Sequence, residues 1–164
     1  MYPYKVKYFY IFGRHKIIIV VDSSNNKQVK SRQRVSDHGE VFTAEREVNA
    51  MLDLVKQETE RIDSRFLEPA CGNGNFLAEV IKRKLAVVNS RYSSSQLEWE
   101  RYSVVAVSSI YGVDILQDNV HECRERLFGI FNDIYTRHFS DKCKPECLRS
   151  VNTYWKEIFF GVMH

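Results

Sequence analysis

Two glycines that follow a short apolar stretch constrain the fold of this chain more than any other feature. Residues 65–68 (Arg-Phe-Leu-Glu) are centred on apolar side chains and stop at Pro69, a pattern that is typical of a short buried strand. Gly72 and Gly74 come next and predict a tight turn. Apolar residues then recur at helical spacing, at Phe76, Leu77, Val80, Ile81 and Leu85. The predicted order is therefore strand, glycine turn, helix.

The same alternation continues along the chain. Residues 102–110 are rich in β-branched side chains and predict a second strand, which follows a Ser-rich loop at residues 89–96 and ends at Gly112-Val113-Asp114. Residues 120–134 have the apolar spacing of another amphipathic helix, and residues 44–61 predict one before the first strand. An order of strand, helix, strand, helix predicts an α/β fold with a parallel core.

The two ends of the chain differ from this central part. Residues 4–21 are aromatic and β-branched, with an interruption at Gly13-Arg14, and predict a β-hairpin. The basic stretch that follows is interpreted as a solvated linker, with a phosphate-contacting arm as the alternative. We therefore divide the chain into an N-terminal extension (1–28), a central α/β part (29–139) and a tail (140–164). In the tail, Tyr154 is the expected start of a further, incomplete strand.

Composition adds few constraints on function. The 164 residues carry 24 basic and 21 acidic side chains, a net charge of +3 that permits nucleic-acid binding without arguing for it. The apolar runs are too short to span a bilayer, and basic residues interrupt the N-terminus, so we expect a cytoplasmic protein with four reduced cysteines. Cys143 and Cys147, near His138, lack a second ligand pair. Incidental thiols on a helix are therefore favoured over a zinc site, and no metal is expected.

The glycine turn and the next acidic residue suggest a nucleotide-type ligand. A Gly-x-Gly turn at the carboxyl end of a strand lets the backbone approach a ligand closely. Asp114, at the end of the second predicted strand, can accept hydrogen bonds from both hydroxyls of a ribose. Its separation from Gly72 exceeds the roughly 20 residues of a compact dinucleotide unit, and the loop at 89–96 accounts for much of the excess. The alternatives are an ordinary turn and a helix N-cap.

Three segments resemble one enzyme family in order and spacing. Residues 68–77 (Glu-Pro-Ala-Cys-Gly-Asn-Gly-Asn-Phe-Leu) resemble the Asp-Pro-Ala-Cys-Gly-x-Gly-x-Phe-Leu motif of the N6-adenine DNA methyltransferases of restriction-modification systems. Residues 39–43 resemble the Gly-x-x-Phe-Thr-Pro entry segment of that family, with Ala44 in place of the proline. Residues 111–115 resemble its acidic strand end. The resemblance covers residues 29–139 and implies part of a Rossmann-like class I methyltransferase fold, truncated, with the hairpin as an added extension.

The resemblance implies one site for S-adenosylmethionine, divided among the three segments. The residues that it implies for cofactor binding are Phe42 and Thr43 at the methionine end, Glu68, Ala70, Gly72 and Gly74 around the amino-acid portion, Asp114 at the ribose hydroxyls and Ile115 against the adenine ring. In this family the methyl group passes from the sulfonium to the exocyclic amine of a flipped-out adenine in DNA.

The catalytic motif of the family is absent from the sequence. That motif is Asn- or Asp-Pro-Pro followed by an aromatic residue, whereas Pro3, Pro69 and Pro145 are isolated from one another. We therefore expect no catalytic residue in this chain, weak or no binding of S-adenosylmethionine and no methylation by the chain alone, and a complementary methyltransferase chain or specificity subunit as partner. Two alternatives remain open: a non-catalytic cofactor- or partner-binding module, and an NAD-type α/β protein.

Overall fold

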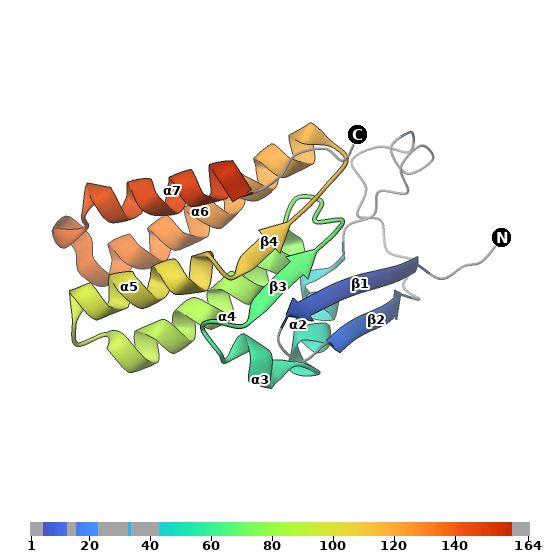
Figure 1. Ribbon diagram of the computed structural model, residues 1–164, viewed down its shortest axis with the longest axis horizontal. Coiled ribbons are helices and arrows are strands. Elements are labelled where there is room, and N and C mark those ends of the chain that lie inside the picture. The colour runs from blue at the N-terminus through green and yellow to red at the C-terminus, as the bar shows by residue number, and fades with distance from the viewer. Residues whose placement is uncertain (1–4, 13–15, 23–32, 34–42, 159–164) are drawn as a thin grey trace.

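A mixed four-stranded sheet forms one side of the molecule in the computed structural model, which describes residues 5–12, 16–22, 33 and 43–158 (Figure 1). The strands are β1 (Lys5–Phe12), β2 (Lys16–Asp22), β3 (Arg65–Glu68) and β4 (Ile110–Gly112), in the order β2-β1-β3-β4. Strands β3 and β4 are parallel, and β1 is antiparallel to both of its neighbours, β2 and β3. The hairpin predicted at the N-terminus is confirmed, and it continues the sheet on one side of β3.

Helices make up most of the described chain. They are α2 (Glu45–Asp53), α3 (Lys56–Thr59), α4 (Asn75–Tyr92), α5 (Gln96–Val107), α6 (Gln117–Phe139), the 3-10 turn η1 (Ser140–Lys142) and α7 (Pro145–Ile158). Helix α4 contacts α5 and α6, and α7 contacts the same two helices. The four long helices therefore close a cycle beside the sheet (Figure 1). Trp99, Phe131, Tyr135, Val151 and Trp155 are among the residues buried in the core.

The predicted alternation of strand and helix is present, so the chain has α/β character. Strand β3 leads through the glycine turn into α4, and β4 leads through Asp114 into α6. Phe66 on β3 and Ile110 on β4 pair in parallel register, and both are buried. The parallel part is small, however, because only two of the described strands take part in it.

The prediction of a strand over residues 102–110 is wrong. Helix α5 occupies residues up to Val107, and only Ile110–Gly112 forms a strand. Trp99, Ser103 and Ala106 are buried at helical spacing, so packing of one helix face overrides the strand preference of the β-branched residues. The Ser-rich loop is also shorter than predicted, because α4 continues to Tyr92 and α5 begins at Gln96.

The expected strand in the C-terminal tail is wrong as well. Residues 145–158 form α7, in which Val151 and Trp155 are buried one helical turn apart. The Tyr154 hydroxyl donates a hydrogen bond to the Ser108 carbonyl oxygen at 2.7 Å, which ties α7 to the segment that leads into β4. The tail therefore completes the helical layer instead of extending the sheet.

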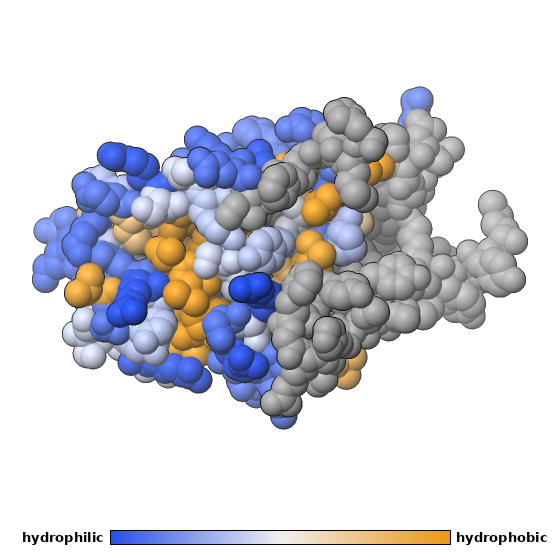
Figure 2. Space-filling model, in the orientation of Figure 1, coloured by the Kyte–Doolittle hydropathy of each residue, from blue (hydrophilic) through white to orange (hydrophobic). Residues whose placement is uncertain are grey.

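Two smaller differences concern the N-terminal half. The helix predicted over residues 44–61 is divided into α2 and α3 at Leu54 and Val55. The interruption at Gly13-Arg14 and the basic linker lie outside the described residues, apart from Gln33. On the face shown in Figure 2, an apolar strip crosses the helical layer over α4 and α5. Val104 of α5 is among the large apolar residues left exposed, at 37%.

Candidate functional site

The carboxyl ends of β3 and β4 lie side by side and continue to pair beyond the strands. The Val113 amide donates to the Glu68 carbonyl oxygen at 2.9 Å, and the Cys71 amide donates to the Val113 carbonyl oxygen at 2.9 Å. These bonds hold the glycine turn that follows β3 against the acidic segment that follows β4. Ligands of open α/β sheets bind at this edge, outside the carboxyl ends of the parallel strands.

The two glycines of the turn have different structural roles. Gly72 (φ 52°) and Gly74 (φ 81°) both adopt left-handed conformations that other residues rarely take. A Cβ atom on Gly74 would lie 2.5 Å from the Cys123 sulfur, so this glycine also allows α4 to pack closely on α6. Gly72, in contrast, presents its amide to a side chain of the neighbouring loop.

That side chain is Asp114, whose carboxylate joins the two loops. Its Oδ2 accepts a hydrogen bond from the Gly72 amide at 2.8 Å, and its Oδ1 accepts one from the Leu116 amide at 2.8 Å and one from Asn119 Nδ2 at 3.4 Å. Asp114 as a whole residue is buried, with 8% of its surface exposed. Each carboxylate oxygen can accept more than one hydrogen bond, so Asp114 can hold the turn and still accept a ligand hydroxyl.

Thr43 reaches the same cluster from the N-terminal side. It is buried, and its carbonyl oxygen accepts a hydrogen bond from Asn75 Nδ2 at 3.0 Å. Asn75 is the first residue of α4, and its Oδ1 accepts a hydrogen bond from Arg126 of α6. Asn75 and Arg126 were not predicted, because polar residues on the exposed part of a helix carry no distinguishing sequence pattern. Phe42 lies outside the described residues.

The remaining predicted residues line the edge of this cluster. Glu68 is buried at the end of β3, whereas Ala70 is exposed and Ile115 is 53% exposed. A large apolar side chain left open beside a carboxylate can contact a ligand that has both hydroxyl groups and a flat apolar ring.

Cys71 is a buried residue of the glycine turn. It packs beside Cys123, and both thiols are free and buried. The hydrogen bond with Cys71, together with burial, raises the pKa of the Cys123 thiol well above its ordinary value. Nucleophilic cysteines need the opposite shift, because the thiolate is the reactive form.

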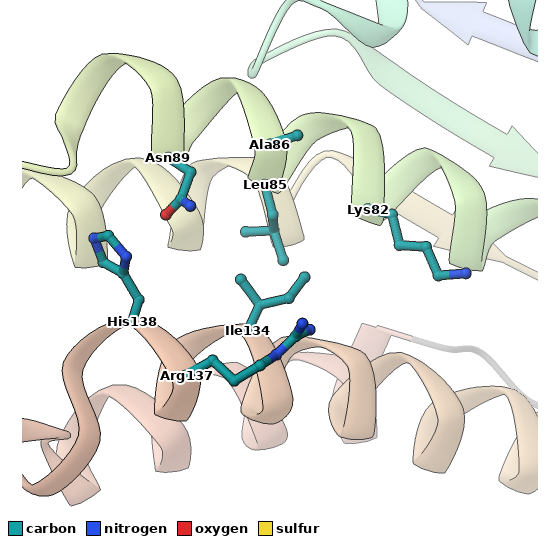
Figure 3. A pocket seen from close by; sticks show the side chains of 7 residues that line it. All are labelled: Lys82, Leu85, Ala86, Asn89, Ile134, Arg137 and His138. Carbon is teal, nitrogen blue, oxygen red and sulfur yellow. The ribbon is translucent and has the colours of Figure 1, made fainter.

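A groove lies between α4 and α6, away from the glycine turn (Figure 3). This groove of about 360 Å³ is lined by Lys82, Leu85, Ala86, Asn89, Ile134, Arg137 and His138. Lys82 Nζ pairs with Glu79 at 2.5 Å. None of the residues predicted for cofactor binding lines it.

The amino ends of β3 and β4 carry a polar cluster that the sequence reasoning missed. Lys82, Arg83 and Lys84 are three consecutive basic residues, a run that usually lies on a solvated face, but the Lys84 side chain is fully buried. Its ammonium donates to the carbonyl oxygens of Ile62 (2.9 Å) and Ser64 and to Ser109 Oγ (2.6 Å). Burial lowers the pKa of Lys84 to about 7.

In the part of the chain that the structure describes, no three His, Cys, Asp or Glu side chains cluster as a metal site would require, and Cys143 and Cys147 are free and half-buried. None of the helices described is long and apolar enough to cross a membrane. No protein-family model, curated protein or solved structure matches the chain.

Proposed function

We propose that this chain is the S-adenosylmethionine-binding part of an adenine-specific DNA methyltransferase, with a partial class I, Rossmann-like fold. One observation carries the proposal: Thr43, the glycine turn and Asp114 are distant in sequence but join in one hydrogen-bonded cluster. These are the three segments whose sequences resemble the cofactor site of that family. Their convergence supports a common ligand more strongly than any of the motifs does alone.

In this proposal each part of the cofactor meets a group of matching chemistry. The Asp114 carboxylate, which already accepts three hydrogen bonds, accepts one more from a ribose hydroxyl, and the exposed Ile115 packs against the adenine ring. The start of α4, after Gly74, faces the methionine carboxylate, since a helix N-terminus presents unpaired amides to an anion. Glu68 lies at the end of β3, where its carboxylate can attract the methionine ammonium.

The chain is proposed not to methylate DNA by itself. The three prolines are isolated from one another, so the Pro-Pro motif that holds the target adenine is absent from this sequence. A complementary methyltransferase chain or a specificity subunit would have to supply that motif and the DNA contacts. The cofactor supplies the methyl group, and the residues of this chain would bind and orient it.

Calorimetry on the purified chain tests the cofactor half of the proposal. The sequence alone predicts weak or no binding, but because the three segments lie together we expect S-adenosylmethionine to bind and NAD not to bind. Asp114→Ala should abolish the binding, whereas Asp141→Ala, which removes an exposed carboxylate from η1, should leave it unchanged. Circular dichroism would verify that both variants are folded. Binding of NAD in place of S-adenosylmethionine would contradict the proposal and favour a different nucleotide-binding protein.

Transfer of radioactive methyl groups to DNA tests the other half. We expect no incorporation by the chain alone and measurable incorporation after mixing with a chain that carries Asn-Pro-Pro-Tyr. Binding without complementation would favour a non-catalytic cofactor-binding module. Methylation of adenine by the chain alone would contradict the proposed need for a partner.

A further inference from the structure

The outer edge of the sheet is formed by β2, whose sequence is unusual for an edge strand. Among the described strands, only β1 pairs with β2, so β2 is the outermost strand of the described sheet on this side. Residues 17–21 are five consecutive β-branched aliphatic residues, Ile-Ile-Ile-Val-Val. Long apolar edges of this kind are sites of strand addition, and monomeric proteins usually interrupt them with charges, prolines or bulges.

The seven residues of β2 are complementary to themselves in antiparallel orientation. The strand begins with Lys16 and ends with Asp22, and its centre is Ile19. When two copies of β2 run antiparallel with Ile19 opposite Ile19, Lys16 of each copy comes opposite Asp22 of the other. Opposite charges that face each other across two strands stabilise their pairing, whereas like charges destabilise it.

We propose that β2 is an interface between two copies of this chain, paired antiparallel about a two-fold axis through Ile19. The pairing joins the two sheets through their β2 edges into one continuous sheet. Displacement by two residues in either direction would keep the faces matched, but it would move Lys16 away from Asp22 and shorten the pairing within β2. Only the register centred on Ile19 pairs the whole of β2 with both of its charged ends, and an isologous two-fold contact closes the assembly at a dimer.

The backbone register within one chain is compatible with this arrangement. Asp22 lies opposite Lys5 of β1 in the hairpin, so in the dimer it would lie between two basic residues, Lys5 on one side and Lys16 of the second copy on the other. Strand β4, which carries the candidate site at its end, is at the opposite edge of the sheet from β2. Dimer formation therefore leaves the candidate site accessible and does not depend on the proposed function.

The charged ends allow a test in which two defective variants repair each other. Sedimentation analysis of the whole chain should show a concentration-dependent dimer. Lys16→Asp places acid opposite acid at both ends, and Asp22→Lys places base opposite base. Each variant alone should dimerise roughly tenfold more weakly than the wild type. An equimolar mixture restores opposite charges at both ends, so native mass spectrometry should detect the heterodimer.

A second pair of variants tests the position of the axis. Ile19→Lys puts two ammonium groups opposite each other on the axis and should prevent dimer formation, whereas Ile19→Val should retain it. Circular dichroism and thermal unfolding would verify that every variant has the fold of the wild type. A wild-type chain that sediments as a monomer at all concentrations would overturn the proposal. Failure of the two charge variants to associate would overturn the register, as would open-ended assembly of the wild type.

Discussion

The two ends of the β3–β4 pair are held by opposite charges. At the carboxyl ends, the Asp114 carboxylate accepts hydrogen bonds from the backbone amides of Gly72 and Leu116. At the amino ends, the Lys84 ammonium donates hydrogen bonds to the carbonyl oxygens of Ile62 and Ser64 and to the Ser109 hydroxyl. Each charged group satisfies the backbone groups that the short strands leave unpaired.

The difference between the ends is their access to solvent. Lys84 is fully buried beneath the Phe66 ring, whose centroid lies 5.2 Å from the ammonium nitrogen. Asp114 is also buried, but the exposed Ile115 follows it directly in the chain. The amino ends are therefore sealed around the Lys84 ammonium, whereas the open carboxyl ends have a large apolar side chain exposed next to the Asp114 carboxylate.

Substitution of Gly74 should lower the free energy of unfolding the most, because it strains the turn that forms the open carboxyl ends. In Gly74→Ala the new Cβ meets the Cys123 sulfur at 2.5 Å and the residue must keep φ at 81°. Strain in the left-handed region and overpacking together should lower the free energy of unfolding by about 4 kcal/mol. Urea denaturation would measure the loss.

Gly129 offers a matched control for that substitution. It lies in α6, and a Cβ there would meet nothing within 4 Å. Gly129→Ala should therefore raise stability, by about 0.5–1 kcal/mol, because alanine loses less conformational freedom in a helix. An equal loss in both alanine variants would show that the close contact with Cys123 does not decide the role of Gly74.

Removal of the buried Lys84 ammonium should give the next largest loss in the free energy of unfolding. Lys84→Met keeps the aliphatic bulk but leaves the carbonyl oxygens of Ile62 and Ser64 without their donor. The free energy of unfolding should fall by about 3 kcal/mol. Each buried carbonyl oxygen left without a donor costs about 1–3 kcal/mol, and part of this loss is offset because the variant no longer buries a charge. Lys82→Met, two residues earlier and 44% exposed, should change stability by less than about 1 kcal/mol. Equal losses would contradict a special role of the amino-end cluster.

The same lysine should give the folded chain a distinctive pH dependence. Burial lowers the pKa of Lys84 from 10.5 to about 7, so between these values the unfolded chain binds more protons than the folded one. The free energy of unfolding should therefore rise with pH, by about 2 kcal/mol between about pH 7 and pH 9. Below about pH 7 Lys84 is protonated in both states, so this gain is absent. The measurement is the difference between wild-type and Lys84→Met unfolding curves at each pH. Parallel stability profiles would exclude Lys84 as the titrating group.

Sequence reasoning succeeded where the backbone itself requires a residue type. Gly72 and Gly74 occupy left-handed conformations, and such positions favour glycine strongly enough to be recognised in a sequence. The placement of Asp114 followed from the order of elements, because the carboxyl ends of neighbouring parallel strands must lie together. The glycine turn and the position of Asp114 beside it were predictable for these reasons.

Sequence reasoning failed where distant packing decides the outcome. Val104 and Val105 favour a strand locally, but burial of Trp99 on the same segment makes it helical. Lys84 stands in a run of three basic residues, and only the carbonyl oxygens brought to it from the segment after α3 explain its burial. Neither effect leaves a local pattern, so neither the second strand nor the amino-end cluster could be placed correctly without the structure.

The smallest predicted effect concerns one hydrogen bond of the sealed end. The Ser109 hydroxyl accepts from Lys84 Nζ at 2.6 Å and donates to the Ala106 carbonyl oxygen at 2.7 Å. Ser109→Ala should lower stability by about 1 kcal/mol. Since the lost bond favoured the charged ammonium, the pKa of Lys84 should fall further and the rise in stability should begin at lower pH. Ser108→Ala removes a neighbouring hydroxyl that bonds only locally to Val105, so it should leave that pH dependence unchanged. A common pH profile for the two variants would show that Ser109 does not hold the ammonium.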